Sequence, residues 1–166
     1  MATREHSMKI AIYPGTFDPI TMGHVDVVQR GLKLFDKVII AVADSPKKSP
    51  MFDVQTRLDM VNATFANEKR IQTLSFDGLL VNLAQTHQAT AILRGLRAAS
   101  DFEYEFQLAA MNRKLDAEIE SVFVMAREEY TFVSSSFIRE ISSMGGDVNA
   151  LVPTAVRAYL PQKGKK

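Results

Sequence analysis

The run Val38-Ile39-Ile40-Ala41-Val42-Ala43 limits the possible folds more than any other part of the chain. It is apolar at every position and does not alternate, which is typical of a strand covered on both faces. It is also far shorter than the roughly 18 apolar residues needed to span a bilayer. The run therefore predicts a buried central strand in a chain without a membrane span.

Short apolar runs alternate with helical patterns along the whole chain. The expected strands are Lys9–Tyr13, Lys37–Ala43, Arg70–Phe76, Ala91–Leu93 and Ser121–Met125. The expected helices are His24–Lys33, Val54–Phe65, Leu79–Thr86, Asp101–Leu115, a fifth from Ser134 or Ser135 to Ser143, and a short Pro153–Leu160. This alternation predicts an α/β fold, an open five-stranded parallel sheet with helices on both faces.

Local signals indicate where these elements begin and end. Asp53 is an expected N-cap, and Ser100 to Glu103 has capping-box spacing for the fourth helix. Gly145 and Gly146 are expected to end the fifth helix. With no linker or repeat, residues 1–166 are expected to form one domain, with residues 1–8 and 161–166 as flexible ends.

Composition excludes several classes of function. With 20 basic and 19 acidic residues the net charge is +1, which gives no support for broad nucleic-acid or membrane-surface binding. The chain has no cysteine, so disulfides, thiolate metal sites and a cysteine nucleophile are excluded. The N-terminal letters MATREHS lack the apolar core of a secretory signal. We expect a soluble, cytoplasmic protein.

The predicted sheet also indicates where a ligand binds. In open α/β sheets, ligands lie beyond the carboxyl ends of the strands, where loops lead into helix N-termini. The segments expected there are Pro14–His24, Asp44–Phe52, Asp77–Leu80, Arg94–Asp101 and Ala126–Ser136.

The first of these segments, YPGTFDPITMGH, has two readings. It could be an ordinary loop in which Thr21 caps a helix and His24 has a structural role. Alternatively, Gly15 and Gly23 let a ligand approach the backbone, Thr16 offers polar groups, and His24 lies at a helix N-terminus that favours anions. The Walker A loop and the spaced-glycine dinucleotide fingerprint are both absent.

Three further segments favour the second reading. Arg94 and Arg97, spaced around Gly95, suit forked binding of phosphate oxygens. Lys47 and Lys48 lie in the loop SPKKSP after the second strand. The run Ser134-Ser135-Ser136 at a helix start, with Arg139 one turn later, can form an anion cradle. Together these loops predict a site for a nucleoside triphosphate and a second phosphorylated ligand.

The motifs resemble those of a known superfamily. Gly15 to Pro19, then Thr21-Met22-Gly23-His24, and late in the chain Ser134 to Arg139 are similar to the Rossmann-like nucleotidyltransferase superfamily. The block RGLRA..DFEYE.QLA.MNR.L, from Arg94 to Leu115, is similar to the bacterial phosphopantetheine adenylyltransferase family. The resemblance covers roughly Lys9 to Tyr159.

The resemblance implies roles for individual residues. His24 would be the catalytic transition-state stabiliser, while Lys48, Leu80, Arg94 and Thr16 would bind the acceptor 4′-phosphopantetheine. The ATP-binding set that it implies is Thr16, Phe17, His24, Gly95, Leu96, Arg97, Glu105, Tyr130, Thr131, Phe132, Val133, Ser134, Ser135 and Ser136. Tyr130 stands where tryptophan is expected in this family, so adenine contacts could differ.

The implied reaction explains which residue types are missing. The acceptor phosphate, with a second pKa of about 6, is already mostly dianionic and needs no general base to attack the α-phosphorus of ATP. A Mg²⁺ ion would accompany ATP and rely mainly on phosphate oxygens and water, with few dedicated protein ligands, and no metal-binding residue is assigned. The resemblance also implies a homohexamer and inhibition by coenzyme A.

Other functions remain open. Within the same class, the chain could adenylylate nicotinamide mononucleotide or transfer a cytidylyl group to a polyol phosphate. The cytidylyl branch typically shows Arg-x-x-Gly-Ile-Ser-Thr, which EEYTFVSSS does not match. From another class, the chain could be a non-catalytic nucleotide-binding sensor, although the joint presence of Thr21, Gly23, His24, Arg94 and Ser134 argues against it.

Overall fold

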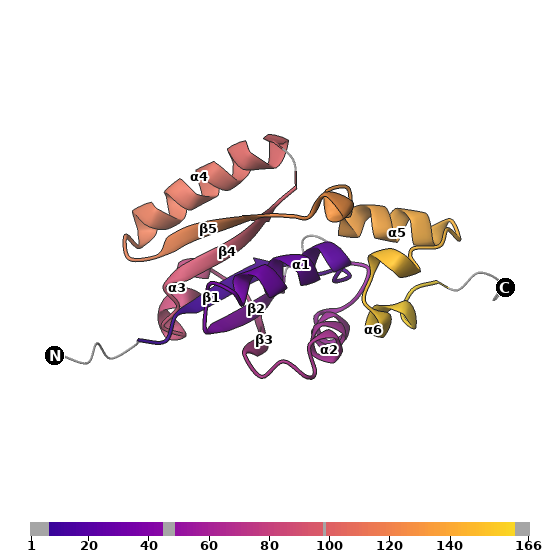
Figure 1. The fold of residues 1–166 in the computed structure, drawn as a ribbon, viewed down its shortest axis with the longest axis horizontal. Helices are drawn as coiled ribbons and strands as arrows, with labels where there is room; N and C mark the ends of the chain where they lie inside the picture. The colour runs from indigo at the N-terminus through magenta and orange to yellow at the C-terminus, as the bar shows by residue number, and fades with distance from the viewer. Residues whose placement is uncertain (1–6, 45–48, 98, 162–166) are drawn as a thin grey trace.

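The computed structural model describes residues 7–44, 49–97 and 99–161, and its centre is a parallel sheet of five strands (Figure 1). The strands are β1 (Ile10–Gly15), β2 (Lys37–Ala43), β3 (Ile71–Phe76), β4 (Ala91–Leu96) and β5 (Glu120–Met125). They lie in the order β3-β2-β1-β4-β5, and every pairing is parallel. The predicted α/β class is confirmed.

Helices follow the strands in chain order. The α-helices are α1 (Met22–Gly31), α2 (Val54–Thr64), α3 (Leu80–Thr86), α4 (Ala99–Leu115), α5 (Ser135–Ser143) and α6 (Thr154–Arg157). Two 3₁₀ turns, η2 (Glu128–Tyr130) and η3 (Asn149–Leu151), flank α5. No helix in the described ranges combines the length and the apolar character that a membrane crossing requires.

The strands bury alternate side chains on the two faces of the sheet. On one face, Val38, Ile40 and Leu93 pack with residues of α1, α2, α5 and α6. On the other, Ile39 and Ile92 pack with residues of α3, and α4 contacts β4 and β5. This explains why β2 is apolar nearly throughout, because both of its faces are covered.

The predicted boundaries are mostly correct. Asp53 caps α2 by accepting from the amide of Thr56, and Ser134 caps α5 by accepting from the amide of Phe137. Helix α5 ends before Gly145, which has a φ of 79°. The last helix is shorter than predicted, because only Thr154–Arg157 is helical and Leu160 enters the core from irregular chain.

Two further boundary predictions are wrong. Strand β4 continues three residues past Leu93, because Arg94, Gly95 and Leu96 pair in register with β5. That pairing overrides the weak strand preference of glycine. Helix α4 begins at Ala99, so Ser100 lies inside it and is not the predicted N-cap.

The strand order places a switch point beside β1. From β1 the chain moves outward through β2 to β3 and then returns to β4 on the other side of β1. At such a point the loops after the two neighbouring strands separate and leave a crevice beyond their carboxyl ends. Strands β1 and β4 end there, at Gly15 and Leu96.

Candidate active site

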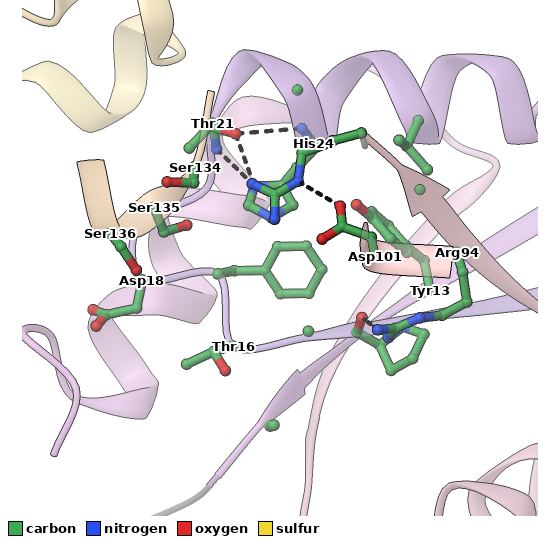
Figure 2. Close-up of a pocket in the computed structure, with 18 of the residues that line it drawn as sticks. Tyr13, Thr16, Asp18, Thr21, His24, Arg94, Asp101, Ser134, Ser135 and Ser136 are labelled. Atoms are coloured by element: carbon green, nitrogen blue, oxygen red, sulfur yellow. Dashed lines mark hydrogen bonds and ion pairs between the residues drawn. The ribbon is translucent and has the colours of Figure 1, made fainter. Parts of the chain in front are cut away.

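A cavity of about 950 Å³ lies at this switch point (Figure 2). Its walls come from the turn after β1, the start of α1, the end of β4, α4 and the start of α5. The predicted site residues among its lining are Thr16, Phe17, His24, Arg94, Gly95, Arg97, Glu105, Val133, Ser134, Ser135 and Ser136. Segments far apart in sequence thus meet in one hollow.

His24 is held by the first turn of α1. Its Nδ1 accepts a hydrogen bond from the backbone amide of Thr21 at 3.0 Å, while the hydroxyl of Thr21 accepts from the amide of His24. This reciprocal pair is a capping box, so the predicted cap by Thr21 is confirmed. Because Nδ1 acts as an acceptor, the hydrogen of the neutral ring resides on Nε2.

The surroundings keep the His24 ring neutral. Burial, together with the positive charges of Arg97 and Arg94, lowers its pKa from 6.5 to about 4. The ring also packs edge-on against Phe17, with centroids 5.0 Å apart. At neutral pH, His24 is therefore a fixed hydrogen-bond donor through Nε2 rather than an acid or a base.

The start of α5 offers further donors to the cavity. The hydroxyl of Ser134 accepts from the amide of Phe137, and that of Ser136 accepts from Nη2 of Arg139. In neither contact does the serine use its hydroxyl hydrogen, so both can donate to a ligand, whereas Ser135 donates its own to the carbonyl of Pro19. With the unpaired amides of the first helical turn, this end of the cavity favours an anion.

Arg94 and Glu105 form an ion pair across the cavity wall. Nε and Nη2 of Arg94 donate to the two carboxylate oxygens of Glu105 at 2.8 and 2.6 Å, and Nη1 donates to the carbonyl of Pro14. Although burial opposes it, pairing with Glu105 raises the pKa of Arg94. The guanidinium is thereby fixed in orientation, which suits directed contact with a ligand oxygen.

Arg97, just after β4, also lines the cavity. Its Nη1 donates to the carbonyl of Val133 at 3.1 Å, and its Nε lies 3.7 Å from the carboxylate of Asp101. Asp101 was not among the predicted site residues, although it also lines the cavity. Arg97 thus joins the end of β4 to the segment that leads into α5.

Two buried charged residues that the sequence did not single out shape the same hollow. Asp18 accepts from the amides of Met51 and Phe52 at 2.8 and 3.0 Å. Arg57 is 1% exposed and donates to the carbonyls of Thr16, Ala43 and Phe52. These bonds connect the loops after β1 and β2. The sequence signal that could have identified Arg57 is a charged residue on a helix face that otherwise carries apolar residues such as Met60 and Val61.

Some predicted residues lie elsewhere. Leu80, at the start of α3, lines a small recess of about 30 Å³ that shares Arg94, Glu105 and Leu108 with the main cavity. Leu96, Tyr130, Thr131 and Phe132 do not line the main cavity, and Phe132 is largely exposed. Lys48, and with it Lys47 and the extreme ends of the chain (1–6 and 162–166), fall outside the described residues.

Over the described part of the chain, the carboxylate and imidazole groups around the cavity are not arranged as the ligands of a protein-bound metal ion. Among the residues that the structure describes, no group of three histidine, aspartate or glutamate side chains is placed to hold one. Of the carboxylates that line the cavity, Asp18 is occupied by backbone amides and Arg139, and Glu105 is bound by Arg94. Asp101 has only a long ion pair with Arg97. Such a wall fits a Mg²⁺ ion that arrives on a triphosphate and keeps mostly phosphate and water ligands.

Comparison with known proteins gives concordant results. The cytidylyltransferase-like family model matches residues 12–141. The chain is 56% identical over 153 residues to a phosphopantetheine adenylyltransferase of Methylococcus capsulatus, covering 92% of this chain and 94% of that protein. It is 50% identical over 157 residues to the phosphopantetheine adenylyltransferase of Coxiella burnetii, covering 95% and 98%.

Solved structures agree on the fold. A structure from Vibrio parahaemolyticus described as a nicotinate-nucleotide adenylyltransferase superposes with a TM-score of 0.70 over 92% of this chain and 91% of its own, at 20% identity. A lipopolysaccharide core biosynthesis protein of Thermoplasma volcanium gives a TM-score of 0.58 over 74% of this chain and all of its own, also at 20% identity. At that identity the likeness concerns the fold alone.

Proposed function

The chain belongs to the cytidylyltransferase-like family and, within it, to the phosphopantetheine adenylyltransferases, and on that premise we propose how its cavity carries the reaction. The enzyme transfers the adenylyl group of ATP to 4′-phosphopantetheine and releases dephospho-coenzyme A and pyrophosphate. The reaction is a step of coenzyme A biosynthesis.

The observation that carries the proposal is the neutral His24 ring beside the start of α5. Its Nε2–H is directed by the Thr21 contact, and its pKa of about 4 prevents it from removing a proton from the acceptor at neutral pH. The acceptor phosphate needs no base, since its second pKa is about 6. His24 therefore donates to an α-phosphoryl oxygen and stabilises the charge that builds up there.

Different walls of the cavity bind the two substrates. Arg97, Ser134 and Ser136, together with the α5 amides, hold the triphosphate of ATP. Arg94, fixed by Glu105, holds the acceptor phosphate, and the pantetheine arm extends from there along the cavity wall toward Leu80. Bound at a switch point, the two anions are kept close enough for in-line displacement.

Magnesium binds with the triphosphate in this proposal. When bound, it would neutralise charge on the phosphate oxygens, and Asp101 is the residue that could add one protein oxygen. Without it, Arg97 would be the main cation facing the triphosphate, because Arg94 is paired with Glu105 and Arg139 with Asp18.

Assembly, regulation and location are also part of the proposal. The chain acts as one cytoplasmic domain and assembles into a homohexamer. Exposed apolar side chains on α4, among them Phe102, Phe106 and Met111, support association between copies of the chain. Coenzyme A inhibits by competition in this proposal, because it shares the adenosine and pantetheine parts of the product and would compete for the same cavity.

The test is release of pyrophosphate from ATP with each acceptor in turn. We expect release with 4′-phosphopantetheine and none with nicotinamide mononucleotide or a polyol phosphate paired with CTP. Release with another acceptor only would overturn the assignment, and nucleotide binding with no release would identify a sensor. Light scattering of the purified protein measures the oligomeric state independently.

A further inference from the structure

A buried carboxylate on α1 lies outside the cavity yet controls one of its walls. The side chain of Asp26 is 2% exposed and lies two residues after His24 on the same helix. It binds Nε of Arg30, one turn along α1, at 3.1 Å, and Nε of Arg127 at 2.9 Å. It also accepts from the backbone amide of Arg127 at 3.0 Å.

The two arginines differ in what they join. Arg30 and Asp26 belong to one helix, so their ion pair connects nothing beyond α1. Arg127 is separated from Asp26 by 101 positions and begins the segment that follows β5. The Asp26–Arg127 contact is therefore a tertiary link between the helix of His24 and that segment.

From Arg127 a series of hydrogen bonds leads to the anion-binding end of the cavity. The carbonyl of Arg127 accepts from the amide of Tyr130 at 2.9 Å, and the carbonyl of Tyr130 accepts from the amide of Val133 at 3.0 Å. The carbonyl of Val133 accepts from Arg97. Ser134, the cap of α5, comes next in the chain.

The first turn of α1 lies directly against this segment. A Cβ added to Gly23 would lie 3.8 Å from both Cβ and the carbonyl oxygen of Tyr130, which is ordinary van der Waals contact. Residues 127–133 are thus packed on α1 and held at both ends, by Asp26 and by Arg97.

We propose that Asp26 and Arg127 are positioning residues for the ATP side of the site. They fix the start of α5 relative to His24 without touching the ligand, since neither lines the cavity. This inference rests on the proposed function, because it assigns the triphosphate to the α5 end. If the proposal holds, loss of the Asp26–Arg127 contact weakens binding of ATP and leaves binding of the acceptor unchanged.

The test compares Arg127→Ala with Arg30→Ala. Each removes one guanidinium from the same buried carboxylate, but only the first weakens the hold on the segment 127–133, where the bond from the backbone amide of residue 127 to Asp26 remains. For Arg127→Ala we expect KM for ATP to rise by about tenfold, with KM for phosphopantetheine unchanged. Arg30→Ala should leave both KM values near those of the parent, with a comparable change in Tm for the two variants. Equal KM values for ATP in the two variants would overturn the proposal.

Hydrogen exchange gives a second measurement that does not depend on turnover. The amides of Tyr130 and Val133 should exchange faster in Arg127→Ala than in Arg30→Ala, and Arg127→Lys should recover part of the protection. Unchanged exchange at both amides would also overturn the proposal. Failure of the proposed function is distinguishable, because the unmodified protein would then make no dephospho-coenzyme A, whereas these exchange rates would still report on the link.

Discussion

The backbone amide of Thr21 donates to Nδ1 of His24 across 3.0 Å, so the cap of α1 determines which ring nitrogen carries the hydrogen. One side chain thus has two functions, because it completes a helix cap and presents Nε2–H to the cavity. The two readings of this histidine, structural and functional, are therefore compatible. They can still be separated, since a cap needs only an acceptor, whereas the reaction needs a donor.

Replacing His24 with alanine should remove both functions. We expect kcat to fall on the order of a hundredfold or more, by analogy with the loss of one oxyanion donor, with ATP affinity nearly unchanged. The Tm should also fall, because the capping box is lost. His24→Glu provides the control, since glutamate at this position restores the cap but not the donor. It should recover Tm without recovering kcat, and near-normal kcat in either variant would contradict the catalytic role.

The His24 ring should titrate far below neutrality. Because its pKa is lowered from 6.5 to about 4, the unfolded chain binds a proton between these values that the folded chain does not. The stabilisation is complete above about pH 6.5 and is lost as the pH falls toward 4. Over that window the Tm should decline more steeply in the parent than in His24→Gln. An NMR titration of the ring, assigned with the same variant, should give a midpoint near 4; a midpoint near 6.5 would refute the burial argument.

Replacing Arg94 with alanine should weaken phosphopantetheine binding more than ATP binding. The expected loss is roughly 1.5–3 kcal/mol, the value of one charged hydrogen-bond partner. The change also leaves Glu105 buried without its partner, so Tm should fall. Adding Glu105→Gln should recover part of the Tm but none of the acceptor affinity. Calorimetric titration with each ligand decides the question, and equal losses for both would mean that Arg94 supports the whole site.

A methyl group at Gly95 should disturb the packing of α1 against β4. A Cβ there would lie 2.6 Å from Cγ2 of Val27, a stiff β-branched side chain on the helix that carries His24. Gly95→Ala should cost about 1–3 kcal/mol of unfolding free energy and lower kcat. Adding Val27→Ala makes room and should restore part of both. As a control, Gly23→Ala meets no atom closer than 3.5 Å and should leave Tm nearly unchanged; a similar drop in both single variants would disprove this explanation.

The fold and the edge that holds the site were predictable because they depend on local patterns. The apolar run of β2 and the alternation of elements were enough to place the turn after β1, Arg94 and the serines of α5 on one edge. Pairings between distant residues were not predictable. Arg94 and Glu105 were expected to hold different substrates, yet they bind each other.

The partners of buried charged residues could not be predicted from the sequence either. The sequence places Asp26 in an expected helix among valines, but it indicates neither that the carboxylate is buried nor that its partner is 101 residues away. The same holds for Asp18, whose partners at Met51 and Phe52 lie beyond the next strand. Periodicity shows which face a residue occupies, whereas its partner depends on how the loops are arranged over the sheet.

The buried Arg57 has a practical consequence for redesign of this enzyme. All three of its hydrogen bonds end on main-chain carbonyls, so they do not depend on which side chains stand at positions 16, 43 and 52. A library that varies Thr16 and Ala43, both of which line the cavity, would keep the loops in place while changing the shape offered to the acceptor. Arg57 itself should be left constant in such a library, because it is the common anchor that makes the surrounding positions free to vary.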